Sequence, residues 1–364
     1  MQYRCNTCGK TAPVDTLAPK CDCGGLWTLD YEPSKFDLQE IDTSIWGMFR
    51  YHKFMALRDD SWKSVTLGEG MTPLVAFDED LTLKMDYYMP TLSYKDRGAA
   101  VLISHCKSIG VESVVQDSSG NAGNSVAAYC GRCGMGCDIY VPEGTSPGKI
   151  AMIQAHGATA HVVPGSRDHC ADVCRAQVDL EGKYYANHVY NPFFYEGTKT
   201  YLYEVYEQLG RVPENIFLPV GNGTLFIGVI KALEHLLDSG CIDHMPQLIA
   251  VQSERCDPIV KAAAEHAEQP AKVTPAPTMA EGIAIGVPMR GSEILAYIYK
   301  YGIRTVTVPE DRILEARSAL AKKGIYAEHT TAANLAAYWR YCEIYGKTPD
   351  SLITMCGAGL KSDH

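Results

Sequence analysis

Strand-like and helix-like segments alternate along most of this chain of 364 residues. From about residue 111, short apolar runs such as "SVVQDS" and "CDIYVP" precede longer helical segments such as "NSVAAYCGRCGM". The alternation resumes beyond residue 197 and continues to "SLITMCGAG" near the C-terminus. Such alternation predicts mostly parallel sheets that are covered by helices on both faces. Two runs of it predict two three-layer α/β domains with a cleft between them, and ligands then bind at loops beyond the carboxyl ends of strands.

The domain organisation follows from these two runs. We expect a small α/β domain at residues 95–194 and a large α/β domain formed by residues 31–94 and 195–364. A Cys-rich ribbon at residues 1–30 precedes both. Because 46% of the residues are hydrophobic and only 21% are charged, the chain can bury a large core.

The overall charge and the cysteines exclude several classes of protein. A net charge of -10 argues against a surface that binds duplex nucleic acid, which needs a basic face. No apolar run approaches the roughly 18 residues of a membrane span, and "MQYRCNTCGK" lacks the apolar core of a signal peptide. Fourteen cysteines without such a signal favour a reducing compartment, and we expect the cytoplasm.

Cys130, Cys133 and Cys137 are expected to pack one face of a helix.

The N-terminal ribbon contains two close cysteine pairs. Cys5 and Cys8 are followed, after twelve residues, by Cys21 and Cys23 in "CDCGG". Turns of this kind can bring four thiolates around one tetrahedral Zn²⁺ ion. The second pair is C-x-C rather than the commoner C-x2-C, so a ribbon that keeps its shape without metal is the alternative. The spacing predicts a structural zinc site.

Two glycine-containing loops follow predicted strands. In "LPVGNGTLFIG" a strand ends at Val220, and the loop Gly221-Asn222-Gly223-Thr224 opens a helix at Leu225. Backbone N–H groups and a hydroxyl at a helix start can hold a phosphate, although an ordinary βα turn has the same pattern. In "DSSGNAGNS" the second loop offers hydroxyls, an amide and N–H groups that suit a carboxylate.

A single lysine, Lys95, stands in "MPTLSYKDRGAA", just where a helix is predicted to begin. Together with the two loops, this stretch resembles the fold type II pyridoxal-phosphate enzymes, and most closely the threonine synthases. The matching motifs are Ser93-Tyr94-Lys95-Asp96-Arg97-Gly98, Ser119-Gly120-Asn121 and Pro219-Val220-Gly221-Asn222. Further matches are "EGMTPL", "NPFFYEGTKT", "EGIAIGVP" and "GAGLKS", and the Cys-rich ribbon also resembles that family. The resemblance covers nearly the whole chain in order.

The resemblance implies a role for each of these residues. Lys95 would form the Schiff base with pyridoxal phosphate and then move substrate protons, with the cofactor as the electron sink. Asn121 would hydrogen-bond the cofactor's 3-hydroxyl, and Cys356 would face its pyridine nitrogen. The cofactor phosphate would be held by Gly221, Asn222, Gly223, Thr224 and Leu225, in the large domain. The substrate carboxylate would be held by Ser118, Ser119, Gly120, Asn121 and Ala122.

Lysine chemistry agrees with this role. A partly desolvated lysine beside a cation loses its proton more readily and becomes nucleophilic. Arg97 is the candidate cation, and a surface Lys-Asp-Arg cluster is the alternative interpretation.

The chain also departs from the family. Threonine synthases usually have glycine where Leu92 stands and phenylalanine where Tyr94 stands. Their Asn-Pro-x-Arg pattern ends here in Phe194, so an expected arginine is missing. Their C-terminal threonine is replaced by Cys356, and a thiol is a weaker hydrogen-bonding group, with Thr354 as a less favoured substitute.

Two activities therefore remain open. The first is that of a threonine-synthase-like lyase, which converts O-phosphohomoserine to threonine and phosphate. The second is β-elimination or β-replacement on serine, threonine or O-phosphoserine, as in dehydratases, ammonia-lyases and enzymes that form cysteate. Either activity requires pyridoxal phosphate and a small amino-acid substrate, which is phosphorylated in some of these reactions. The zinc expected in the ribbon is structural and remote from the chemistry. The sequence leaves the oligomeric state open, with a homodimer as the expectation.

Overall fold

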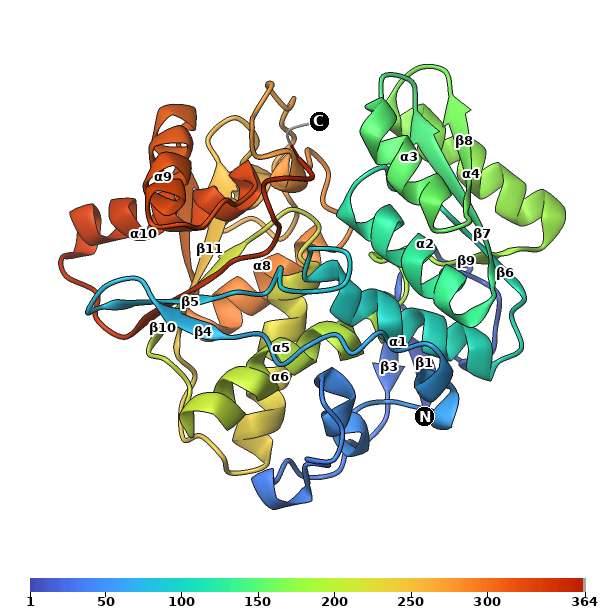
Figure 1. The fold of residues 1–364 in the computed structure, drawn as a ribbon, viewed down its shortest axis with the longest axis horizontal. Coiled ribbons are helices and arrows are strands. Elements are labelled where there is room, and N and C mark those ends of the chain that lie inside the picture. The colour runs from blue at the N-terminus through green and yellow to red at the C-terminus, as the bar shows by residue number, and fades with distance from the viewer. Residues whose placement is uncertain (363–364) are drawn as a thin grey trace.

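Two mostly parallel sheets with helices on both faces make up most of the molecule (Figure 1). The computed structural model describes residues 1–362, and of residues 167, 168 and 181 only the backbone. The six-stranded sheet and its helices form one lobe, and the four-stranded sheet and its helices form the other (Figure 1). The α/β class and the three-layer arrangement predicted from the alternation are confirmed.

The larger sheet has the strand order β12-β11-β10-β13-β5-β4. All neighbours are parallel except β4, which pairs antiparallel with β5 at the sheet edge. In the centre, Asn215 of β10 lies opposite both Ser351 and Gln247. The strands are β4 (Leu74–Ala76), β5 (Leu81–Lys84), β10 (Asn215–Pro219), β11 (Gln247–Ser253), β12 (Arg304–Val308) and β13 (Ser351–Thr354).

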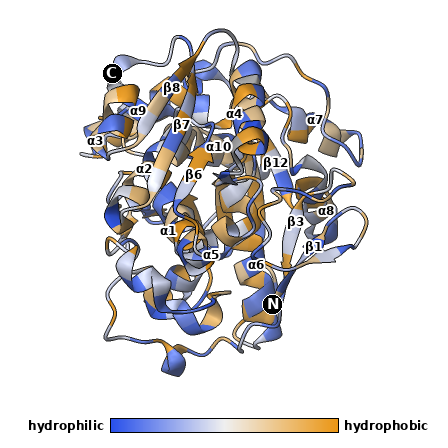
Figure 2. Ribbon diagram, turned by 90° about the vertical axis from the view of Figure 1, so that its right-hand side faces the viewer, coloured by the Kyte–Doolittle hydropathy of each residue, from blue (hydrophilic) through white to orange (hydrophobic). Residues whose placement is uncertain are grey.

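The helices of this lobe cover the sheet from both sides because successive strand residues point to opposite faces. Ile216 and Leu218 of β10 belong to the apolar cluster that includes the buried residues of α5 and α6. Phe217 between them belongs to the cluster of α9 and α10. The apolar residues of the inner helices α5 and α6 are plain in Figure 2. The helices are α5 (Phe193–Leu209), α6 (Thr224–Asp238), α7 (Pro258–Ala264), α8 (Gly291–Tyr301), α9 (Glu310–Lys322) and α10 (His329–Tyr345).

The smaller sheet has the order β8-β7-β6-β9 and is parallel throughout. Helices cover both faces of this sheet as well. Val114 packs with the helices α1 and α2 on one face, and its neighbour Val115 packs with α4 on the other. The strands are β6 (Ser113–Gln116), β7 (Gly136–Pro142), β8 (Thr159–Val163) and β9 (Tyr184–Tyr185). The helices are α1 (Lys95–Ser108), α2 (Asn121–Cys133), α3 (Pro147–Ala155) and α4 (Arg167–Glu181).

The expectation that Cys130, Cys133 and Cys137 share one helix is wrong for Cys137. Cys130 and Cys133 lie on α2, but Cys137 lies on β7, because Gly134 ends the helix in a left-handed conformation. Cys130 and Cys137 are buried, as packing residues would be, and Cys133 is half-buried. The domain boundaries at residues 30, 94 and 194 stay a prediction.

The N-terminal ribbon is a small antiparallel sheet of β1 (Gln2–Cys5), β2 (Thr11–Ala12) and β3 (Trp27–Asp30), with β1 in the centre. Tyr3 of β1 stacks on Trp27 and packs edge-on against His105 of α1 and Phe193 of α5. The ribbon therefore rests on the helix that begins with Lys95. Short 3-10 helices at Leu38–Glu40, Met48–Phe54 and Asp60–Ser64 lead from it to the first sheet.

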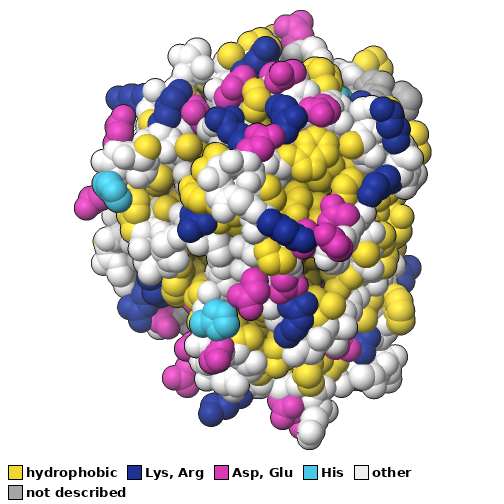
Figure 3. Space-filling model, turned by 90° about the vertical axis from the view of Figure 1, so that its left-hand side faces the viewer, with side chains coloured by type: hydrophobic (Ala, Val, Ile, Leu, Met, Phe, Trp, Pro, Cys, Tyr) yellow, Lys and Arg dark blue, Asp and Glu magenta, His cyan; other side chains and the backbone are white. Residues whose placement is uncertain are grey.

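The surface carries charges of both signs. On the face drawn in Figure 3, lysines and arginines are interspersed with aspartates and glutamates, and apolar side chains lie between them. None of the helices within residues 1–362 has the length and apolar character that crossing a membrane requires.

Candidate active site

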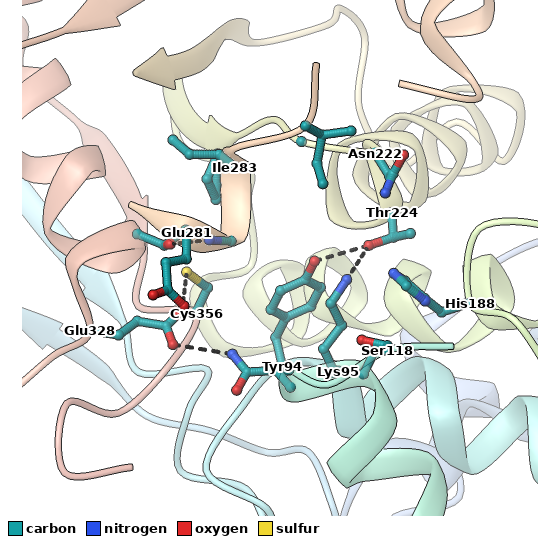
Figure 4. A pocket seen from close by; sticks show the side chains of 18 of the residues that line it. Tyr94, Lys95, Ser118, His188, Asn222, Thr224, Glu281, Ile283, Glu328 and Cys356 are labelled. Atoms are coloured by element: carbon teal, nitrogen blue, oxygen red, sulfur yellow. Dashed lines mark hydrogen bonds between the residues drawn. The ribbon is translucent and has the colours of Figure 1, made fainter. Parts of the chain in front are cut away.

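A cavity of about 200 Å³ lies where loops from both lobes meet. The loops that line it follow β6, β10 and β13, at the carboxyl ends of these parallel strands, as expected for α/β sheets. Lys95 lies among them at the start of α1 (Figure 4). The cavity is lined by all the residues predicted for cofactor and substrate except Leu225, whose side chain is buried in the core.

The turn before α1 is held by Asp96. This buried carboxylate accepts hydrogen bonds from the Thr91 N–H group at 2.7 Å and the Thr91 hydroxyl at 2.5 Å, and a third from Ser125 of α2. Tyr94 N–H donates to the carbonyl of Cys356 at 3.1 Å, which joins this turn to the loop after β13. The start of α1 is thereby attached to both lobes.

Lys95 is half-buried and points at the loop that follows β10. Its Nζ donates to Thr224 Oγ1 at 2.8 Å, and the Tyr94 hydroxyl lies 2.9 Å from the same oxygen (Figure 4). The Nζ atom also lies 5.6 Å from the centre of the Phe194 ring. Aromatic rings on its flank keep much of the water away from this amine.

Arg97 has a different role from the one expected. Its guanidinium is fully buried and donates to Asp86 and to Glu204, with shortest distances of 2.6 Å to each. Lys84 completes the cluster by donating to Glu204 at 3.0 Å. Burial acts to raise the pKa of Glu204, but Arg97 and Lys84 lower it to about 2. The cluster ties α1 to β5 and α5, so the expectation of a cation acting on Lys95, and that of a surface cluster, are both wrong.

The loop after β10 is shaped to receive an anion. Gly223 has a φ angle of 78°, and a Cβ atom there would lie 2.6 Å from Ile294 Cδ1, so glycine is required. The helix α6 starts at Thr224, and the first N–H groups of a helix have no acceptor within it. These N–H groups, the helix dipole and the Thr224 hydroxyl together suit a phosphate.

The loop after β6 faces this phosphate cradle. Ser118, Ser119, Gly120 and Ala122 line the cavity together with Asn121, where α2 begins. A Cβ atom on Gly123 would lie 1.8 Å from the carbonyl oxygen of Ser118, so the loop turns too tightly for any larger residue. The loop presents hydroxyls and the N-terminal end of α2 to the cavity, which suits a carboxylate.

The end of the cavity near the loop after β13 carries a carboxylate to which the sequence analysis assigned no role. Glu328 precedes α10 and accepts from Asn121 Nδ2 at 3.1 Å and from the Cys356 thiol at 3.8 Å (Figure 4). Burial raises the pKa of Glu328 and also that of Cys356. The Cys356 sulfur lies 3.2 Å from Thr331 Oγ1, so that the thiol has oxygen partners on two sides.

Thr354 does not belong to the site. Its hydroxyl lies 2.8 Å from that of Tyr201, and its side chain is fully buried away from the cavity. Of these two residues, Cys356 is the one that lines the cavity.

Comparison with known proteins identifies the family. The family model described as "Pyridoxal-phosphate dependent enzyme" matches residues 65–357. The chain belongs to this family. It is 33% identical to threonine synthase from Methanocaldococcus jannaschii over 99% of this chain and 93% of that protein. Threonine synthase from Methanosarcina acetivorans is 30% identical over 92% of this chain and 85% of that protein. The family assignment makes the chain a pyridoxal-phosphate-dependent lyase related to threonine synthases, and the resemblance seen in the sequence is confirmed.

Solved structures with the same fold carry other activities. The processed form of threonine deaminase isoform 2 from Solanum lycopersicum has a TM-score of 0.72 at 21% identity, covering 91% of this chain and 93% of that one. Maize serine racemase has a TM-score of 0.67 at 18% identity, covering 79% of this chain and 88% of that one. At these identities the similarities show that this chain shares the fold of those enzymes.

The residues of the cavity fit the family's cofactor, pyridoxal phosphate. The fit rests on three groups in one cavity: the amine of Lys95, the anion cradle at Thr224, and the polar pair Asn121 and Glu328. An aldehyde carbon, a phosphate and a ring hydroxyl are the cofactor groups that such residues accept.

The ribbon thiols fit a metal ion. The Sγ atoms of Cys5, Cys8, Cys21 and Cys23 all lie within 4.8 Å of one another. A tetrahedral zinc site with bonds of about 2.3 Å places its sulfurs about 3.8 Å apart. The sulfur distances of 3.5 Å from Cys5 to Cys23 and 3.7 Å from Cys8 to Cys21 agree with this geometry.

Several lining residues were not assigned a role from the sequence. They are Tyr94, Lys149, His188, Glu281, Glu328 and Lys361. Tyr94, Glu281 and Lys361 lie inside motifs that match the family, so the motifs pointed to them without giving a role. Glu328 had a weaker signal, namely an acidic residue directly before an apolar helix. His188 and Lys149 are brought to the cavity only by the fold.

Proposed function

We propose that this protein is a threonine synthase, which converts O-phosphohomoserine and water to threonine and phosphate. One observation supports this most: Lys95 Nζ lies 2.8 Å from Thr224 Oγ1, between an anion cradle and a carboxylate-binding loop. The similarity to proteins named threonine synthase supports the proposal, with 33% identity over 99% of the chain for one of them.

Different residues of the cavity bind the cofactor and the substrate. When bound, pyridoxal phosphate supplies an electron sink for the carbon that loses a proton. Gly221, Asn222, Gly223 and Thr224 would hold the cofactor phosphate, and Asn121 would orient its ring hydroxyl. Cys356, which donates to Glu328, would meet the ring nitrogen.

Other residues of the cavity act on the substrate. The loop Ser118–Ala122 holds the substrate carboxylate, which fixes the Cα–H bond toward Lys95. Lys95 Nζ takes a proton from the substrate and returns one later, so its amine acts as both base and acid. Phosphate leaves from the γ-carbon and water adds at the β-carbon, which balances the overall reaction.

A second function is favoured by one observation. Among the described residues no arginine lines the cavity, and Phe194 occupies the position of the arginine expected from the family pattern. Its ring packs on Gly98, where a Cβ atom would lie 2.3 Å from Phe194 Cδ1, and lies 5.7 Å from the His188 ring centre. A less cationic cavity suits β-elimination or β-replacement on serine or threonine, whose side chains are uncharged. O-phosphoserine, the third substrate of this alternative, carries the same phosphate as O-phosphohomoserine, so this observation does not favour it.

A product assay separates the two functions. The purified enzyme with pyridoxal phosphate is given O-phosphohomoserine, O-phosphoserine, serine or threonine in parallel reactions. Threonine and phosphate formed in equal amounts from O-phosphohomoserine support the first function. Ammonia and a 2-oxo acid from serine or threonine, with no threonine formed, would instead support the second.

We also propose a cytoplasmic location and a homodimer. The location is supported by the described cysteines, which form no disulfide. Cell fractionation tests the location, and sedimentation equilibrium tests the assembly.

A further inference from the structure

Three lysines line the cavity, and they differ in their surroundings. Lys95 donates to Thr224 at 2.8 Å, and Lys361 donates to the Thr91 carbonyl at 2.7 Å. Lys149 lies on α3, on the side of the four-stranded sheet, and its ammonium contacts Glu281 Oε2 at 3.0 Å. Lys149 forms an ion pair with a carboxylate from the lobe of the larger sheet.

The Lys149–Glu281 pair spans the cavity and is only weakly held. Both residues line the cavity. Glu281, which is labelled in Figure 4, begins the short 3-10 helix Glu281–Ile283, and this helix contacts α10 of the larger lobe. The side chain of Lys149 is 27% exposed and that of Glu281 is 77% exposed. Ion pairs this open to water contribute little stability, so a stronger anion can replace Glu281.

The position of Lys149 suits a doubly charged group. Lys149 lies in the first turn of α3, whose N-terminal end attracts negative charge, and the N-cap Ser146 Oγ accepts its backbone N–H group. No arginine lines this cavity within residues 1–362, so the charged groups that can meet a second phosphate there are its lysines, and Lys149 adds its charge to that of a helix N-terminus.

We propose that Lys149 binds the distal phosphate of the substrate, exchanging Glu281 for it, and that it thereby selects phosphorylated amino acids. This inference rests on the proposed function, because it requires a substrate with a distal phosphate. Glu281 holds Lys149 in place until the phosphate arrives. A neutral side chain leaves the ion pair intact and gains nothing from Lys149.

Binding and kinetics of matched variants test this inference. The loaded enzyme is titrated by calorimetry with a phosphonate analogue of O-phosphohomoserine, whose carbon–phosphorus bond does not break, and with homoserine. The variants are Lys149→Gln, which removes the charge at similar length, and Glu281→Gln, which frees Lys149. The control is Lys347→Gln, which removes an exposed lysine paired with Glu79 and Asp80 outside the cavity.

The expected result is a loss of affinity for the phosphonate of roughly tenfold or more in Lys149→Gln, with a far smaller change for homoserine. Glu281→Gln should bind the phosphonate at least as tightly as the unmodified enzyme, and Lys347→Gln should match it. The KM for O-phosphohomoserine should rise in Lys149→Gln by the same factor.

Two outcomes overturn the inference and differ in what they say of the proposed function. If the unmodified enzyme forms threonine while Lys149→Gln binds the phosphonate equally well, the inference fails and the function stands. If the unmodified enzyme neither binds the phosphonate nor releases phosphate, both fail together. Phosphonate binding that depends on Lys149, without threonine formation, supports the inference and contradicts the function.

Discussion

Glu328 and Cys356 form the polar end of the cavity, and their side chains are not equivalent. Glu328 accepts from both Asn121 and Cys356, whereas the thiol is one donor with two oxygen neighbours. Replacing the carboxylate disturbs two contacts, whereas a hydroxyl in place of the thiol preserves the contacts of Cys356. Asn121 depends on the carboxylate for its orientation.

Glu328→Gln is therefore expected to lower turnover by roughly tenfold or more, because glutamine has one acceptor oxygen where Asn121 and Cys356 each use one of the two oxygens of Glu328. Cys356→Thr should keep turnover within a factor of about three, since a hydroxyl donates more strongly than a thiol. Steady-state kinetics of both variants checks this. Equal losses in the two variants would show that the carboxylate has no special role.

Leu92 shows a local conflict between sequence and backbone. It has a φ angle of 59°, in the left-handed region, at a position where threonine synthases usually have glycine. The conformation costs a leucine about 1 to 2 kcal/mol, and its side chain is 41% exposed, so packing offsets little of this.

Leu92→Gly should raise the free energy of unfolding by about 0.5 to 1 kcal/mol, after the larger entropy of a glycine in the unfolded chain is subtracted. Urea titration measures the change. Leu67→Gly is the matched control, because Leu67 is equally exposed but has no positive φ, and it should lose stability. A loss of stability in Leu92→Gly as well would contradict the interpretation.

The helix α1 connects the ribbon to the active site. Lys95 is its first residue, and His105 near its other end stacks on Phe193 at 3.7 Å between ring centres. The Tyr3 hydroxyl of the ribbon lies 3.4 Å from His105 Nε2. Burial, helped by Arg58, lowers the pKa of His105 from 6.5 to about 3.

Because the folded protein keeps His105 neutral, the unfolded chain binds the extra proton first as the pH falls below 6.5. The stability that depends on the neutral ring is thus complete above pH 6.5 and is lost progressively down to about pH 3. In His105→Gln the free energy of unfolding should vary less between these limits. The exposed His169 supplies the control variant His169→Gln, and an unchanged slope in His105→Gln would refute the prediction.

The ribbon itself is expected to hold one zinc ion. Metal analysis of protein purified without chelator should find about one zinc per chain, and Cys8→Ser with Cys23→Ser should lose it. Removal should lower the thermal midpoint, because metal binding contributes to folding of such ribbons. Less than about 0.2 zinc per chain would mean that the thiols keep their arrangement without metal.

At the scale of the whole molecule, the sequence predicted what depends on neighbours along the chain. Alternating strands and helices indicated the parallel sheets, and the loops after β6 and β10 indicated the residues at their carboxyl ends. Contacts between segments that are far apart in the sequence could not be predicted from these local patterns. Glu328 reaches Asn121 across 207 positions, and Arg97 reaches Glu204 across 107. Local patterns carry no information on such pairs, which is why the role of Arg97 was misjudged and Glu328 was missed.

The central claim is that Lys95 carries the cofactor. Reduction of the loaded protein with borohydride, followed by digestion and mass spectrometry, locates the lysine that becomes covalently modified. We expect the label on the peptide that contains Lys95, and Lys95→Ala should lose both the visible absorption band and turnover. A label on Lys149 or Lys361, or a Lys95→Ala variant that keeps the band and turnover, would contradict the account.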